Sequence, residues 1–175
     1  MILVSIMKTN LKIVLFVLPL VLWSCSVKYS LTGASISPET KTFQVNYFQN
    51  NSTLIEPGID RDFTNKLIDL LINQTSLDLV KSNGDLLYEG EIVEYRISPT
   101  TATANNTAAQ NRLTISINVR FIDKSDSEAE FEKRFSFYYD YPGSSQLIGS
   151  QKDTAIDEIF ERITQDVFNA SLAKW

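Results

Sequence analysis

The most constraining feature of this chain is a regular alternation of apolar and polar residues over 112–123, RLTISINVRFID. The apolar residues, from Leu113 to Phe121, all fall on one parity. Alternation of this length is typical of a β-strand with one face in the core and the other in water. The segment FEKRFSFYYDY at 131–141 repeats the pattern after a charged turn at 124–130, which favours a hairpin. Such a hairpin needs a second layer of structure to cover its apolar side.

Two amphipathic helical patterns can supply the second layer. Residues 60–75 follow a turn-rich stretch, and Asp60 is a suitable N-cap. Apolar residues recur from Phe63 at i+4, i+7 and i+8, which predicts a helix with one buried stripe. Ser150 and Asp153 have the spacing of a capped helix start near the C-terminus. The apolar stripe of that helix comprises Ile156, Ile159, Phe160, Ile163, Val167 and Phe168.

Further strands precede the alternating hairpin. In KTFQVNYF at 41–48, alternation places Tyr47 on the same face as the apolar residues before it. A short strand at 77–80 and a long strand at 86–97 flank a tight turn. The apolar parity of the long strand changes partway along, and we expect a bulge at Gly90 to reset it.

The predicted element order is β-α-β-β-β-α within a single domain at 41–175. Helices and sheet are each apolar on one side, and they bury those sides most simply against each other. Short turns between sequential strands favour antiparallel pairing. We therefore expect an α+β fold, a two-layer sandwich in which two helices pack on one face of a mostly antiparallel four-stranded sheet.

The first 24 residues differ in composition from the rest of the chain. An unbroken apolar run fills 13–22, and Lys8 and Lys12 precede it. This run is too short to span a bilayer as a helix, which takes about 20 residues. The alternative, a buried core helix, would need polar residues on one face, and the run has none. We therefore expect 1–24 to be a signal peptide that is cleaved.

The only cysteine of the chain directly follows this segment, in the sequence LWSC at 22–25. These four residues resemble the lipobox of bacterial lipoproteins. The resemblance implies that Cys25 becomes the N-terminal residue and carries a diacylglycerol on its sulfur. Two or three acyl chains anchor a protein firmly, since each buried CH₂ contributes about 0.8 kcal/mol. Ser26 implies sorting to the outer membrane, so we expect 25–40 to be a tether and the domain to face the periplasm.

The inventory of reactive side chains excludes most familiar catalysis. Histidine is absent and cysteine occurs once. An intramolecular disulfide, a Cys/His metal site, a Ser/His/Asp triad and a Cys/His dyad are therefore excluded. Loss of residues 1–24 leaves 14 basic and 21 acidic residues, a net charge of −7, which argues against nucleic-acid binding. We expect no enzyme activity, no metal and no cofactor other than the lipid on Cys25.

Three segments carry a resemblance to a known family. They are YSLTGASISPETKTFQVNYFQNNSTL at 29–54, GDLLYEGEIVEYRISP at 84–99 and NRLTISINVRF at 111–121. Together, and with TGASI soon after a lipobox cysteine, they resemble the LptE family of lipopolysaccharide-assembly lipoproteins in the form seen in Bacteroidota. The resemblance implies that the protein sits inside, and helps to assemble, the outer-membrane β-barrel LptD, through which lipopolysaccharide reaches the outer leaflet. It also implies lipopolysaccharide itself as a candidate ligand.

A loop predicted at 98–111 is a candidate for contact with the barrel. It is rich in Thr, Ala and Asn and has no bulky side chains, and long loops in compact domains are often functional. A surface loop without a partner is the equally weighted alternative. The candidate contact residues are Thr101, Thr103, Asn105 and Asn106.

Basic residues near the strand ends are candidates for binding lipopolysaccharide, because they can pair with its phosphates or carboxylates. They are Arg112, Arg120, Lys133 and Arg134. Arg120 and Arg134 lie on the polar parity of neighbouring strands. The alternative is that these residues form ion pairs across the sheet with Glu130 and Glu132.

Three functional classes remain open. The first is a structural partner of an outer-membrane barrel, the second a free periplasm-facing lipoprotein that binds a glycolipid, and the third an enzyme. The inventory of side chains disfavours the third class, and the resemblance favours the first.

Overall fold

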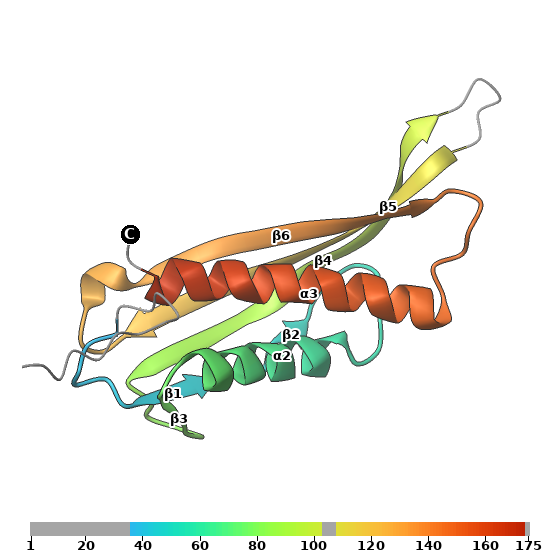
Figure 1. The fold of residues 1–175 in the computed structure, drawn as a ribbon. Helices are drawn as coiled ribbons and strands as arrows, with labels where there is room; N and C mark the ends of the chain where they lie inside the picture. Colours follow the sequence, from blue (N-terminus) through green and yellow to red (C-terminus); the bar gives the residue numbers. More distant parts are fainter. Residues whose placement is uncertain (1–35, 103–107, 174–175) are drawn as a thin grey trace, which may run out of the picture. The chain divides into compact units, whose positions relative to one another are not determined.

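The described residues form an α+β fold with two helices and a mixed sheet (Figure 1). The computed structural model describes residues 36–102 and 108–173, all within the unit Leu31–Trp175. The elements are β1 (Thr42–Val45), β2 (Gln49–Asn50), α2 (Ile59–Gln74), β3 (Asp78–Leu79), β4 (Leu86–Ala102), β5 (Ala108–Asp123), the 3₁₀ turn η1 (Ser127–Ala129), β6 (Phe131–Pro142) and α3 (Gly149–Leu172).

The sheet differs from the expected four-stranded, mostly antiparallel one, because it holds six strands and is mixed. Its order is β3-β1-β4-β5-β6, with β2 also paired to β4. β1 runs parallel to β3 and β4, whereas β5 is antiparallel to both of its neighbours. The helix α2 explains the parallel pairs, because it carries the chain back so that β3 and β4 run in the direction of β1. The short strand predicted at 77–80 is present as β3, whereas β2, with two residues, is too short for alternation to reveal it.

The predicted loop at 98–111 is largely strand. β4 continues to Ala102 and β5 begins at Ala108, and the two strands pair along this extension, with Pro99 opposite Asn111. Thr is a good strand former, and pairing with β5 satisfies backbone groups that a loop would leave to water. The prediction of an irregular loop was therefore wrong for the described part of this segment.

The bulge in β4 lies at Val93 and not at Gly90, because the register with β5 shifts between Ile92 and Glu94. Gly90 is paired in register with β5, and its role is to permit a close approach. A Cβ on Gly90 would lie 2.0 Å from the backbone oxygen of Asn118 and 2.7 Å from Cε1 of Phe48. The absent side chain thus makes room for the Phe48 ring over β4.

The predicted strand at 41–48 ends at Val45 as β1, and the chain changes parity in a detour at 46–48 before β2 begins at Gln49. Tyr47, expected on the buried face, is 54% exposed, whereas Phe48 is fully buried. The backbone N–H of Asn46 donates to the oxygen of Tyr88, and that of Asn51 to the oxygen of Ile92, so both ends of the detour are tied to β4.

Both helices begin differently from the predicted caps. The N-cap of α2 is Gly58, with φ of 88°, and Asp60 lies in the first turn, where a carboxylate favours the helix dipole. The N-cap of α3 is Ile148 and no side chain caps this helix, so Ser150 lies inside it. The predicted end near Thr75 is confirmed, and the predicted apolar stripe of α3 faces the core.

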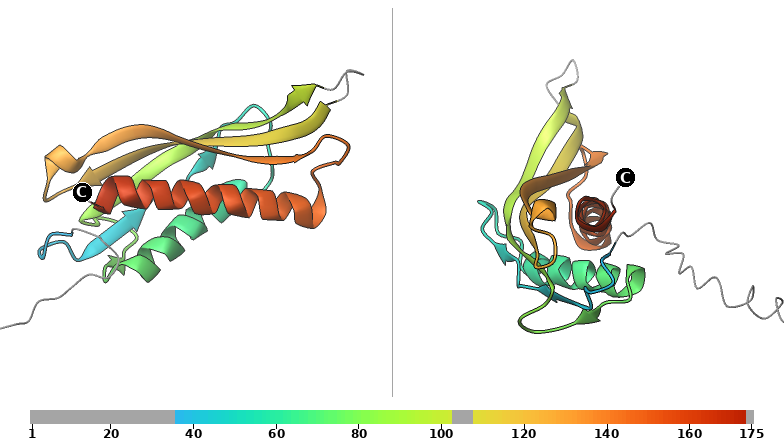
Figure 2. Two further views of the ribbon diagram at one scale, coloured as in Figure 1. Left: turned by 45° about the horizontal axis from the view of Figure 1, so that its top comes forward. Right: turned by 90° about the vertical axis from the view of Figure 1, so that its left-hand side faces the viewer.

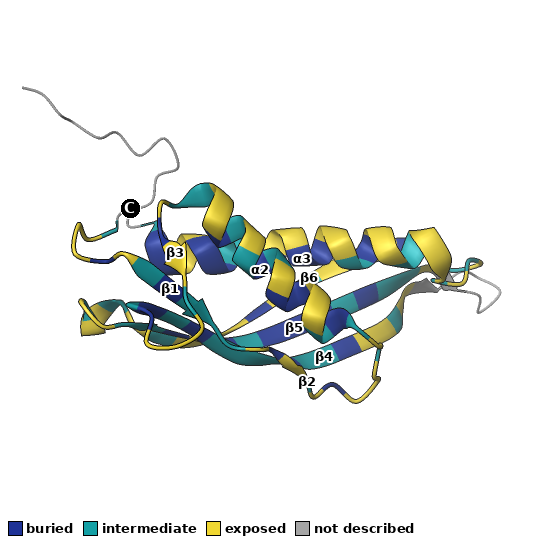
Figure 3. Ribbon diagram, turned by 90° about the horizontal axis from the view of Figure 1, so that it is seen from below, coloured by how far each residue is buried: buried dark blue, intermediate teal, exposed yellow. Residues whose placement is uncertain are grey.

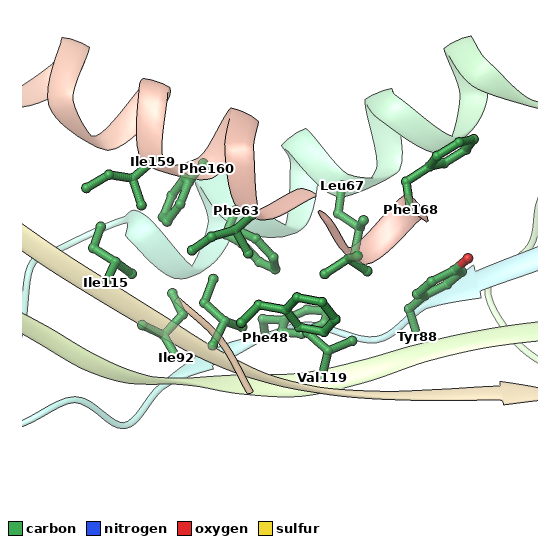
Figure 4. Close-up of a cluster of buried hydrophobic side chains, with 14 of the residues drawn as sticks. Phe48, Phe63, Leu67, Tyr88, Ile92, Ile115, Val119, Ile159, Phe160 and Phe168 are labelled. Atoms are coloured by element: carbon green, nitrogen blue, oxygen red, sulfur yellow. The ribbon is translucent and has the colours of Figure 1, made fainter. Parts of the chain in front are cut away.

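The two helices cover one face of the sheet (Figure 2), and the exposed residues of both lie on their outer sides (Figure 3). The centre of the core is a row of three aromatic rings (Figure 4). Phe63 of α2 makes edge-to-face contacts with Phe48 and with Phe160 of α3, at centroid distances of 5.0 and 5.2 Å. Burial of each such side chain contributes roughly 1.5–3 kcal/mol. Lys66 of α2 also pairs with Asp157 and Glu161 of α3, which ties the helices together at their surface.

Candidate functional site

The face of the sheet opposite the helices is uncovered within the described residues (Figure 2). By the register of the strands, the side chains on this face are largely polar. The register aligns outward side chains in rows across β4, β5 and β6, for example Glu94, Ser116 and Ser136. We call this surface the polar face. Its charged residues are Glu89, Glu91, Glu94, Arg96, Arg112, Arg120, Glu132, Arg134 and Asp140.

Glu94 lies at the centre of the polar face and accepts three hydrogen bonds. Nε of Arg96 donates at 2.7 Å, Oγ of Ser116 donates at 2.8 Å, and Arg134 donates from the edge strand β6. The hydrogen bond from Arg96 holds the pKa of Glu94 below its usual value, although partial burial opposes this effect. The bulge at Val93 makes this arrangement possible. Ile92 faces the core, and without the bulge Glu94 would face the same way; with it, Glu94 points to the polar face.

A second ion pair lies toward the end of the β4–β5 hairpin. Arg112 donates to both carboxylate oxygens of Asp140, at 2.7 and 2.8 Å, and its guanidinium stacks 3.6 Å from the ring centroid of Tyr138. This two-pronged geometry is the strongest form of an arginine–carboxylate pair. The hydrogen bonds from Arg112 lower the pKa of Asp140. Arg112 is thus held by three neighbouring groups of its own chain.

The opposite end of the polar face holds a groove of about 500 Å³ beside the detour between β1 and β2. Arg120 donates to Glu89 at 3.2 Å, and Asn46 donates to the other oxygen of Glu89 at 3.1 Å. Asn51 donates to Glu91 at 2.6 Å. Five of the polar side chains that line the groove therefore already have partners within the chain.

The four basic residues predicted as ligands of lipopolysaccharide do not form one site. Arg112, Arg120 and Arg134 lie on the polar face, but Lys133 lies on the opposite parity, with its ammonium 5.1 Å from the ring centroid of Phe135. Ion pairs across the sheet are present, as the alternative prediction had it, but their carboxylates are not the expected ones. The partners of the three arginines are Asp140, Glu89 and Glu94, in place of the expected Glu130 and Glu132.

Several predicted residues lie outside the described part of the chain. Cys25, Thr103, Asn105 and Asn106 are among these, and so is the signal segment. For Thr101 the structure describes the backbone, which pairs with Gln110 near the end of β4.

Glu94 and Asp140 are the residues that sequence reasoning missed. The sequence did contain a signal for Glu94, because the change of apolar parity in β4 requires a bulge. The bulge was predicted at Gly90, however, and it lies at Val93. Asp140 falls on the polar parity of the strand at 131–141, directly opposite Arg112, once the hairpin register is known. That register depends on a turn containing η1, whose length alternation does not specify.

The arrangement of fixed polar groups on an open sheet face suits contact with another surface. Within residues 36–102 and 108–173, no group of three or more His, Cys, Asp or Glu side chains is placed to hold a metal ion. In the same residues, no helix is both long and apolar enough to cross a membrane. On the polar face, Arg112, Arg120 and Arg134 each form an ion pair with a carboxylate on another strand.

The fold is similar to solved structures at low sequence identity, and such likeness concerns the fold alone. The hypothetical protein CT253 from Chlamydia trachomatis matches with a TM-score of 0.50 at 10% identity, covering 73% of this chain and 93% of that one. The PelC dodecamer from Paraburkholderia phytofirmans gives 0.48 at 9% identity, with coverage of 81% and 94%. Rare lipoprotein B from Shewanella oneidensis gives 0.45 at 11% identity, with coverage of 73% and 89%.

A search of curated protein sequences returned no match. The family model of LptE, described as lipopolysaccharide-assembly, matches residues 40–171. This range runs from just before β1 into the last turn of α3, so it includes the whole described sheet and both helices. The resemblance seen in the sequence is thereby confirmed, and the chain belongs to the LptE family of lipopolysaccharide-assembly proteins.

Proposed function

We propose that the protein is an outer-membrane lipoprotein that associates with the lipopolysaccharide-translocating β-barrel LptD and supports lipopolysaccharide transport to the outer leaflet. In this proposal residues 1–24 are a cleaved signal peptide, Cys25 carries the lipid anchor and the domain faces the periplasm. The observation that carries the proposal is the family match over residues 40–171.

The polar face supports a role inside or against a barrel. The lumen of a large outer-membrane barrel is polar, so a domain that enters it needs a surface that tolerates contact with both water and protein. The ion pairs on the polar face satisfy this need. Arg112, Arg120 and Arg134 each have a carboxylate partner, so docking would not remove an unpaired arginine from water. Thr101, Thr103, Asn105 and Asn106 are proposed as additional contacts at the end of the β4–β5 hairpin.

The alternative function is a free lipoprotein that binds a glycolipid without a barrel partner. Its candidate ligands to phosphate are Arg112, Arg120, Lys133 and Arg134, as predicted from the sequence. For such binding, each arginine would have to exchange its carboxylate for a lipid phosphate or share its donors between the two. This requirement favours the barrel partner over direct glycolipid binding.

The test is a mild-detergent extraction of native membranes, followed by affinity capture through a C-terminal tag and mass analysis. We expect LptD to be recovered in near-equal amount and to stay bound through washing. Recovery of the lipoprotein alone would contradict the proposal and leave the glycolipid-binding alternative. The same preparation tests the anchor, because the mature N-terminal peptide should begin at an acylated Cys25.

Deletion of Thr101–Ala109 tests whether the end of the β4–β5 hairpin contributes to barrel binding separately from the polar face. We expect lower recovery of the barrel and higher permeability of the cells to large antibiotics. Normal recovery and normal permeability would show that the proposed hairpin contacts are not needed.

A further inference from the structure

One end of the domain carries no charged residue in the segments that form it. The segments are 51–55, 97–100, 110–111 and 142–151, and we call them the uncharged end. They contain 21 residues, in which the 21% charged fraction of the whole chain would give about four charged residues. The loops at the other end differ, because residues 36–41, 81–85 and 124–130 contain eight charged residues in 18.

These segments are neighbours in space although they are distant in sequence. Pro99 pairs with Asn111, and Gln110 pairs with Pro142, so the ends of β4, β5 and β6 lie together. Thr53 and Leu54 line a groove with the β4 residues 93–97. Figure 1 shows the loops before α2 and before α3 at the same end as the β4–β5 hairpin, away from the first described residues.

Four large aliphatic side chains are exposed at the uncharged end. Leu54 is 52% exposed, Ile55 72%, Ile97 43% and Ile148 65%. Exposed aliphatic residues that gather at one place, beside polar and uncharged ones, mark a surface that is covered by a partner. Depletion of charge is also the compositional signature of the buried part of a protein–protein interface.

The loop that presents Leu54 and Ile55 is held in a fixed conformation. Ser52 donates from its backbone N–H and its hydroxyl to Oδ1 of Asn50, with the hydroxyl distance at 2.6 Å, and also lies within hydrogen-bonding distance of the oxygen of Leu54. Asn50 in turn donates to the backbone oxygen of Glu56. A loop fixed by its own hydrogen bonds loses little conformational entropy on docking.

Several charged residues that border the uncharged end form ion pairs within the chain. Lys152 lies 2.7 Å from Glu56, which also ties the loop before α2 to the first turn of α3. At the sheet, Arg112 pairs with Asp140 and Arg96 pairs with Glu94, each at 2.7 Å. A partner that covers the uncharged end would therefore not have to bury an isolated charge at its rim.

We infer that the uncharged end is the docking surface of this protein and that it packs against an uncharged protein wall, formed of aliphatic, hydroxyl and amide side chains. This inference rests on the proposed function, in which the wall belongs to the barrel. A protein wall fits better than lipid, because the segments are rich in Ser, Thr, Asn and Gln, whose hydrogen bonds hydrocarbon cannot satisfy. They also contain no Trp, Lys or Arg, the residues that favour the lipid headgroup region.

Charge insertion tests the inference in the full-length, tagged lipoprotein co-expressed with its barrel. The variants Ile55→Lys and Ile148→Lys place a charge at the uncharged end, and both positions are exposed enough to leave the fold unchanged. The controls are Ile72→Lys and Leu79→Lys, which are 49% and 45% exposed but lie in α2 and β3. We expect each end variant to lower barrel recovery at least tenfold and each control to change it less than twofold.

A photoreactive residue at the same positions identifies what covers the surface. Adducts to the barrel from positions 55 and 148, and none from position 72, are the expected result. Adducts to phospholipid alone, or unchanged barrel recovery by both end variants, would overturn the inference and leave the proposed function standing. Failure of the wild-type chain to recover any barrel would instead refute the proposed function, so the two failures are distinguishable.

Discussion

Phe63→Ala should be the most informative perturbation of the core. The side chain is fully buried and joins α2 to both the sheet and α3, through edge-to-face contacts with Phe48 and Phe160. Truncation of a buried phenylalanine costs about 3–5 kcal/mol, depending on how far the surroundings collapse. Both neighbouring rings are themselves held in the core, so collapse is limited, and we expect a loss of about 4 kcal/mol.

A loss of this size is a large fraction of the roughly 5–15 kcal/mol that stabilises a typical domain. Urea unfolding of the unlipidated mature chain, followed by far-UV circular dichroism, measures it as a shift of the midpoint. Ile72→Ala is the matched control in the same helix, since Ile72 is 49% exposed, and its loss should stay below about 1 kcal/mol. Similar midpoints for the two variants would refute the view that the three rings are the centre of the core.

Three further predictions concern the sheet. Gly90→Ala should destabilise the domain by about 1–3 kcal/mol or more in urea unfolding, because the new Cβ would lie 2.0 Å from a backbone oxygen of β5; an unchanged midpoint would contradict the close approach. Tyr88→Phe should cost about 1 kcal/mol in the same assay, because it removes the buried 2.9 Å hydrogen bond to Ser171, and a neutral effect would show that the bond contributes nothing net. Since the pKa values of Glu94 and Asp140 are lowered in the folded state, their contribution to stability is present above their unfolded pKa values, near 4, and is lost as pH falls through the folded values. Glu94→Gln combined with Asp140→Asn should therefore flatten the loss of stability measured below about pH 4.5, and an unchanged slope would assign the acid sensitivity to other carboxylates.

The long amphipathic elements were predictable from the sequence, because alternation and helical spacing report directly which side of an element is buried. The alternating apolar residues from Leu113 to Phe121 are buried as predicted, and so is the stripe of α3 except for Ile156, which is partly buried. The parallel placement of β1 was not predictable, since pairing with β4 depends on the path of α2 and not on any local pattern. Tyr47 was assigned to the wrong side for a similar reason, because the detour between β1 and β2 follows contacts with β4.

The candidate site was predicted less completely than the fold. Arg112, Arg120 and Arg134 were selected because they lie near strand ends, and the last two also by their polar parity. Their partners depend on cross-strand register and on a one-residue bulge. The uncharged end was visible in the sequence only as separate segments without charge. Its meaning depends on the strands and the Lys152–Glu56 pair that bring those segments together.

The position of β1 between β3 and β4 has a consequence for the order in which the chain folds. Phe43 pairs with Leu86, so the first strand gains its neighbour only after about 40 further residues are available. The antiparallel strands β4, β5 and β6 are joined by short connections and pair with less loss of loop entropy. In the proposed function the chain enters the periplasm with its N-terminus first, so β1 would be exposed before its pairing partners β3 and β4 are available, which makes the early intermediate prone to aggregation. We expect its maturation to depend on periplasmic holding factors until β4 has crossed.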